Sequence, residues 1–113
     1  MDSSSNHQTG HDAEKHAAQY LHHQGFRILE LNWRTRYCEI DIVAQKKNSM
    51  YFVEVKYRQS TSQGSGTDYI TAKKLKQMHF AAEMWVQQHN WAEDYQLAVI
   101  SIDADHITFI DEL

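Results

Sequence analysis

The chain has 113 residues, 42% of them hydrophobic and 12% aromatic, with a formal net charge of −4 at pH 7. This length suits a single domain with one core, since compact domains most often hold about 100–150 residues. We find no apolar run of the ~20 residues that a membrane helix needs and expect no secretory leader, which excludes membrane and secreted classes. The single cysteine, Cys38, suits a reducing compartment, so we expect a cytoplasmic protein.

Charge is unevenly distributed along the chain. Residues 27–76 hold ten of the 11 Lys and Arg residues but only five of the 15 Asp and Glu residues. This central segment therefore has a net charge of +5 and the rest of the chain −9. A basic centre in an acidic protein indicates a polyanionic partner such as nucleic acid, and ordinary scatter of surface charge is the alternative.

The N-terminal half is predicted to hold a helix and three strands. Residues 1–10 are polar without apolar periodicity, so we expect a disordered tail before a single domain over residues 11–113. A helix is expected from about His11 to Gln24, with Gly25 at its C-terminal cap. Alternating and β-branched residues then predict strands over Phe26–Trp33, Tyr37–Ala44 and Met50–Tyr57, the last two joined by a polar hairpin loop.

The C-terminal half is predicted to hold a helix and two strands. Residues 59–69 are rich in Ser, Thr and Gly and predict a mobile loop. The following helix, Thr71–His89, has one apolar face, which consists of Leu75, Met78, Ala82, Trp85 and Val86. Phe80 and Met84 lie off that face; we expect them to pack under the sheet, with a homodimer contact as the alternative. Strands are expected over Gln96–Ile102 and Asp105–Ile110.

Together these elements predict an α/β fold with a mixed sheet flanked by helices, in the order α-β-β-β-α-β-β. In the second predicted strand, Glu39 and Asp41 alternate with Ile40 and Ile42, so the two acids are expected on one face. In the third, Glu54 and Lys56 share a face. If Gln45 pairs with Met50 across the hairpin, Asp41 lies opposite Glu54 and Glu39 lies opposite Lys56.

Two opposed carboxylates repel unless a cation lies between them, so these strands predict a site for Mg²⁺ or Mn²⁺. Magnesium prefers oxygen ligands, which Asp41, Glu54 and the backbone carbonyl of Val55 supply. Lys56 is placed to orient or deprotonate a water molecule, or to neutralise a phosphate oxygen. Glu14 on the first helix faces the sheet or its border, and it is a further candidate ligand together with Glu39.

Each of these residues also has a purely structural interpretation. The acids and Lys56 could form the solvated face of a hairpin, and Glu14 could be an ordinary helix surface residue. The basic residues expected to contact phosphates could serve solubility alone; these are Arg34, Arg36, Arg58, Lys73 and Lys74. Trp33, beside two of these arginines, is a further candidate for stacking on an unpaired base.

The coincidence of these motifs resembles a known family. Glu14 on a helix, CEIDIVA over Cys38–Ala44, FVEVK over Phe52–Lys56 and the following Arg58 are similar to the YraN-like family of small bacterial proteins. That family belongs to the PD-(D/E)xK nuclease superfamily and is related to archaeal Holliday junction resolvases. Cys38 stands where the family has Gly, and residues 94–98 depart from the family pattern.

The resemblance implies a restriction-endonuclease-like fold with metal ligands at Asp41 and Glu54, a catalytic Lys56 and a helix acid at Glu14. The leading hypothesis is a Mg²⁺- or Mn²⁺-dependent endonuclease acting on DNA, with branched or structured DNA as a candidate substrate. A non-catalytic nucleic-acid-binding module on the same scaffold is the alternative. A protein-interaction domain that uses Phe80, Met84 and Trp91 is the third hypothesis.

Overall fold

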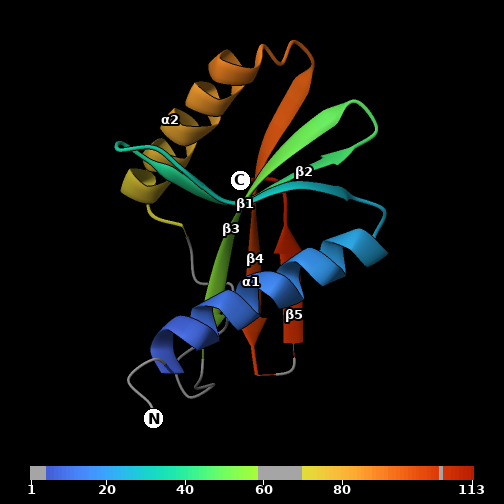
Figure 1. Cartoon of the computed structure of the whole chain (residues 1–113), viewed down its shortest axis with the longest axis vertical. Helices are drawn as coiled ribbons and strands as arrows, with labels where there is room; N and C mark the ends of the chain where they lie inside the picture. Colours follow the sequence, from blue (N-terminus) through green and yellow to red (C-terminus); the bar gives the residue numbers. More distant parts are fainter. Residues whose placement is uncertain (1–4, 59–69, 105) are drawn as a thin grey trace.

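The computed structural model describes residues 5–58, 70–104 and 106–113 (Figure 1). Its elements follow the predicted order α-β-β-β-α-β-β, which confirms the mixed α/β fold. The elements are α1 (Ser5–His23), β1 (Arg27–Arg34), β2 (Glu39–Lys46), β3 (Ser49–Arg58), α2 (Ala72–His89), β4 (Asp94–Asp103) and β5 (His106–Ile110).

The five strands form one sheet in the order β1-β2-β3-β4-β5. Neighbouring strands are antiparallel except for β3 and β4, which run parallel. A parallel pair needs a crossover connection, and here α2 lies in that connection. The sheet is strongly twisted, so β1 and β2 diverge from the direction of β4 and β5 (Figure 1).

The two helices cover opposite faces of the sheet (Figure 1). On one face, Leu21 of α1 is fully buried in a cluster with Ile42 and Ile100. On the other, Trp85 of α2 is buried with Val43 and Phe52. Each sheet face therefore has its own apolar layer, as expected when a largely buried sheet lies between helices.

Local sequence signals mark the element ends. Gly25 follows α1 with a φ of +96°, a backbone conformation that glycine adopts without strain. Thr71 caps the start of α2, where its side-chain oxygen accepts a hydrogen bond from the backbone N–H of Lys74. The β2–β3 hairpin is tighter than predicted, because Lys46 and Ser49 still pair and leave a two-residue turn.

Some predicted boundaries differ from the structure. Helix α1 begins at Ser5, so a disordered tail over residues 1–10 is wrong for residues 5–10, while residues 1–4 lie outside the described part. The predicted loop over residues 59–69 also lies outside it. Among the described helices, neither is long and apolar enough to cross a membrane.

Phe80 does not pack under the sheet, contrary to our expectation. Helix α2 buries Met78, Ala81, Ala82 and Trp85, which lie at helical spacing on one face. Phe80 falls outside that face and is 49% exposed. Met84 is half-buried, and its sulfur lies 3.6 Å from the sulfur of Cys38.

Candidate active site

Strand β2 changes face at Asp41. Ile40 packs under α2, whereas Ile42 packs under α1, so these side chains lie on opposite faces of the sheet. The prediction that Ile40 and Ile42 share a face is therefore wrong. A sequence reading assumes regular alternation, and β2 does not alternate regularly at this point.

The irregularity extends across β1 and β2. Leu31 pairs with Ile42 and Trp33 with Ile40, but the intervening Asn32 and Asp41 form no backbone pair. Asn32 has a φ of +54°, in the left-handed region that asparagine tolerates better than most residues. This conformation turns the Asn32 side chain toward α1, where its Nδ2 donates a 2.6 Å hydrogen bond to Glu14 Oε1.

Strands β2 and β3 separate at the same position. Gln45 pairs with Met50 as predicted, and the pairing continues as far as Ile42 with Val53. Beyond that pair, the backbone N–H of Val55 donates to the Asp41 carboxylate Oδ2 at 2.8 Å. The Asp41 side chain thus satisfies a backbone donor that the diverging β2 backbone leaves without an acceptor.

The β2–β3 pairing ends one residue before the predicted pair of Asp41 with Glu54, and the predicted pair of Glu39 with Lys56 is wrong. Glu39 pairs with Arg34 of β1 instead, and the Glu39 Oε1 lies 3.3 Å from the Arg34 Nη2. At this end β2 remains paired with β1 and has left β3. Both members of the ion pair are largely exposed, at 59% and 65%, so the pair contributes little to stability.

Asp41 lies among several acidic side chains. The pKa of Asp41 is raised to about 7, chiefly by burial and also by the negative charges of Glu54, Glu14 and Glu39. The hydrogen bond from Val55 acts in the opposite direction. The fold therefore brings together acids from α1, β2 and β3, and an added cation would relieve their repulsion.

Glu54 has a cationic partner in the structure. Its Oε2 lies 3.0 Å from the Nζ of Lys74, and the two side chains are 21% and 39% exposed. Of the two lysines predicted from the sequence, Lys74 is therefore the one in contact with the acid cluster, while Lys73 is exposed. Lys56 follows Glu54 by two residues on β3 and is half-buried.

The residues suit a hard divalent cation by their donor chemistry, because the cluster supplies carboxylate oxygens, the ligands that such ions prefer. Within the described residues, no three Asp, Glu, His or Cys side chains are grouped closely enough to hold an ion in their present positions. Binding would require Glu54 to exchange Lys74 for the ion. The Val55 carbonyl and Glu14 stay predicted ligands.

An open groove of about 460 Å³ adjoins the cluster between the β1–β2 turn and α2. Glu39 and Glu54 lie in it, whereas Asp41, Glu14 and Lys56 are not among its lining residues. The lining residues are Tyr37, Cys38, Glu39, Glu54, Lys74, Lys76, Gln77, Met78 and Phe80. Sequence reasoning missed Tyr37 and Lys76; the available signal was an aromatic residue directly after Arg36.

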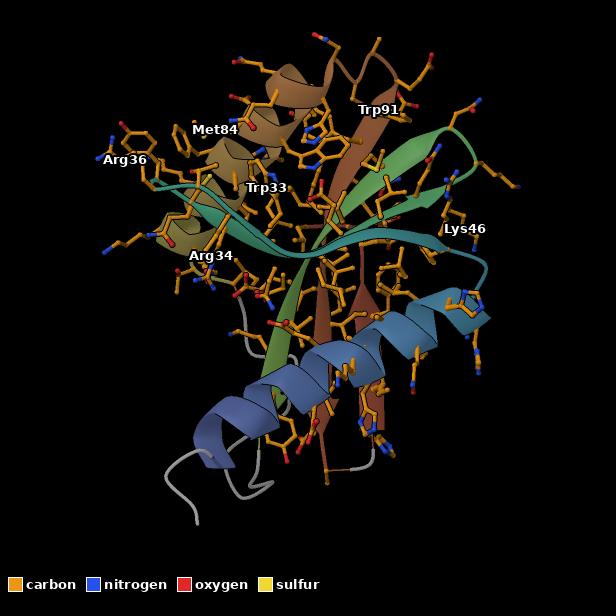
Figure 2. The ribbon with its side chains drawn as sticks, viewed as in Figure 1. Trp33, Arg34, Arg36, Lys46, Met84 and Trp91 are labelled. Atoms are coloured by element: carbon orange, nitrogen blue, oxygen red, sulfur yellow. The ribbon has the colours of Figure 1, made fainter. Side chains whose placement is uncertain are left out.

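The other predicted phosphate contacts are only partly placed. Arg34 and Arg36 lie at the outer end of the β1–β2 pair, beside α2 (Figure 2). The side chain of Arg58 lies outside the described part. Trp33 is half-buried against the α2 cluster, with its ring 6.4 Å from that of His89, which argues against Trp33 as an open stacking surface.

Fold and site together define a small mixed α/β domain with an acidic cluster where two central strands separate. The sequence profile described as uncharacterised protein family UPF0102 matches residues 13–103. A UPF0102 protein of Pseudomonas fluorescens is 37% identical over 99 residues, covering 86% of this chain and 82% of that protein. One from Vibrio parahaemolyticus is 37% identical over 97 residues, covering 84% and 80%.

A more distant relative, from Cytophaga hutchinsonii, is 34% identical over 100 residues and covers 88% of both chains. The chain belongs to the UPF0102 family, which is the YraN-like family that the sequence motifs indicate.

Proposed function

We propose that this chain is a Mg²⁺- or Mn²⁺-dependent endonuclease that hydrolyses DNA phosphodiesters, with branched or structured DNA as its substrate. The observation that carries the proposal is the position of Asp41. Its carboxylate accepts a hydrogen bond from the Val55 N–H where β2 and β3 separate, and the charges of Glu54, Glu14 and Glu39 act on it. Glu54 and Lys56 flank Val55 on β3. A solvated hairpin face would not bury a carboxylate in this way.

The chain's own residues suit that chemistry. Asp41, Glu54 and the Val55 carbonyl would hold the ion, with Glu14 as a further ligand; when bound, such an ion activates water and neutralises phosphate charge. Lys56 would orient the attacking water or stabilise the negative charge that develops on the phosphate. Lys74 would transfer its contact from Glu54 to a substrate phosphate. Arg34, Arg36, Arg58 and Lys73 would contact phosphates farther from the cut.

The second candidate is a nucleic-acid-binding module without activity. The Lys74–Glu54 ion pair favours it, because the acid is already neutralised in part without a metal. The single cysteine supports a cytoplasmic location for either function. A homodimer is proposed for the nuclease.

The test compares four-way junction, flap, single-stranded and fully duplex DNA in Mn²⁺, Mg²⁺ or chelator. We expect metal-dependent cleavage of a branched substrate that Glu54→Gln reduces by at least about 100-fold. Glu83→Gln, which neutralises an exposed acid on α2, is the matched control and should cleave normally. The binding module would be favoured if the logarithm of the DNA affinity falls linearly with the logarithm of the salt concentration, with no metal requirement and no cleavage.

A further inference from the structure

Two aromatic rings in the groove are exposed to solvent. Tyr37, in the turn between β1 and β2, is 67% exposed, and Phe80 of α2 is 49% exposed. Both line the groove that adjoins the acid cluster. Burying an aromatic ring contributes one of the larger hydrophobic free energies to folding. Tyr37 and Phe80 contribute little of this free energy, because both rings are exposed. Core packing therefore does not account for their positions.

The charges around these rings indicate what would cover them. Four of the nine residues that line the groove are charged, namely Glu39, Glu54, Lys74 and Lys76. An apolar helix from another protein would desolvate these charges without pairing them, which is costly. A nucleotide matches the groove better, since its phosphate pairs with lysine and its base offers an apolar face.

Aromatic rings beside cationic side chains are the usual means of binding unpaired nucleotides. Bases stack on the rings, while lysine and arginine contact the backbone. Here the Cζ of Arg36 lies 5.7 Å from the centroid of the Tyr37 ring, adding a cation next to the exposed ring. A volume of about 460 Å³ lies within the range of small-ligand sites, roughly 300–1,000 Å³.

We infer that the groove binds an unpaired nucleotide next to the bond to be cut, with its base against Tyr37 and Phe80 and its phosphate near Lys74 and Lys76. The inference rests on the proposed nuclease function and specifies its substrate class. In a continuous duplex each base is stacked on both faces, so no face is available to a protein ring. DNA with an unpaired nucleotide at the site is therefore preferred over continuous duplex.

The test measures the affinity of the full chain for two fluorescent DNAs in Ca²⁺: a duplex with a short unpaired flap, and the same duplex without it. We expect Tyr37→Ala and Phe80→Leu to weaken flap binding by about tenfold and duplex binding by less than about twofold. Tyr37→Trp, which keeps an aromatic ring, should retain flap binding. Tyr57→Ala removes a tyrosine that is 43% exposed outside the groove, and it should bind both DNAs normally.

Thermal melting of each variant shows whether it is folded, and Mn²⁺ added to the same samples reports cleavage. Equal affinities of the Tyr37→Ala and wild-type chains for the flap, or equal losses on both DNAs, would overturn the inference. Cleavage with unchanged flap selectivity in the variants would overturn the inference and leave the proposed nuclease standing. Ring-dependent flap binding without cleavage would support the inference and contradict the nuclease. A wild-type chain that binds neither DNA would overturn both.

Discussion

The Asp41 carboxylate accepts a 2.8 Å hydrogen bond from the backbone N–H of Val55, across the point where β2 and β3 separate. The side chain of one strand thereby replaces the backbone acceptor that the other strand would otherwise need. A side chain in this position is partly buried, and this burial, with a further contribution from the charges of neighbouring acids, raises the pKa of Asp41.

The first prediction concerns the stability of the metal-free protein. The pKa of Asp41 rises from 3.8 to about 7 on folding, so below about pH 4 the group is protonated in both states. As the pH rises toward 7, the folded chain keeps a proton that the unfolded chain has lost, and the free energy of unfolding falls. Well above pH 7 Asp41 is deprotonated in both states, and the free energy of unfolding falls no further on its account.

Asp41→Asn removes the charge but keeps an oxygen that can accept from Val55. In chelator, we expect the variant to be more stable than the wild type at pH 8 by roughly 2 kcal/mol, or several degrees, with a smaller difference at pH 5. Thermal melts at the two pH values measure this, with Glu83→Gln as the control for losing an exposed acid. A difference that is the same at both pH values would show that Asp41 does not titrate as described.

The second prediction concerns proton release on metal binding. A carboxylate must be deprotonated to bind a cation, so the affinity for Mn²⁺ should increase about tenfold per pH unit below pH 7 and level off above it. Titration calorimetry at pH 6 in two buffers of different ionisation enthalpy should detect close to one proton released. Affinity that does not change between pH 5.5 and 7 would exclude Asp41 as a ligand.

The third prediction separates Lys56 from the metal ligands. Because Lys56 would act on the water or the phosphate, Lys56→Ala should reduce cleavage by at least about 100-fold and leave the Mn²⁺ affinity within about twofold. Lys47→Ala, at an exposed lysine in the β2–β3 turn, is the matched control. Cleavage by Lys56→Ala at the wild-type rate would remove Lys56 from the mechanism.

The fourth prediction uses two adjacent lysines on α2. Lys74 contacts Glu54 at 3.0 Å, and Lys73 is exposed. Lys74→Ala should strengthen Mn²⁺ binding about two- to fivefold, because the ion no longer competes with an ammonium group for Glu54, and it should weaken DNA binding. Lys73→Ala should leave the Mn²⁺ affinity unchanged. Identical Mn²⁺ affinities for the two variants, measured by calorimetry, would show that the ion does not displace Lys74.

The fifth prediction concerns Asn32, whose left-handed backbone and 2.6 Å hydrogen bond to Glu14 act together. Asn32→Ala should destabilise the fold by about 2 kcal/mol, because alanine loses the hydrogen bond and resists a positive φ. Asn32→Gly should recover about 1 kcal/mol of this, since glycine adopts that backbone conformation freely. Urea unfolding measures both; equal losses would mean that the backbone conformation adds no strain.

Much of the fold follows from local patterns in the chain. The apolar face of α2, the cap at Gly25 and the pairing of Gln45 with Met50 all follow from residue spacing and turn chemistry. These features depend on neighbours within a few residues, where the periods of helix and strand are reliable guides. The association of Asp41 with Glu54 was predictable for the same reason, since both are reached from one short hairpin.

Other features required the folded chain. The loss of alternation at Asn32 and Asp41 and the pairing of Glu39 with Arg34 instead of Lys56 contradict a regular reading of the strands. Both arise where β2 leaves β3 to follow β1 on a strongly twisted sheet. The exposure of Phe80 follows from its place off the buried face of α2, and only the folded chain shows that nothing else covers it among the described residues.

The local spacing of residues thus determined which acids and lysines could meet, while only the packing of distant segments decided which of them do. Lys74, and not Lys73, contacts Glu54, and Asn32 donates to Glu14. Both contacts form because folding brings side chains far apart in sequence within hydrogen-bonding distance. Such contacts depend on the relative placement of whole elements, and no periodicity within a single element records that placement.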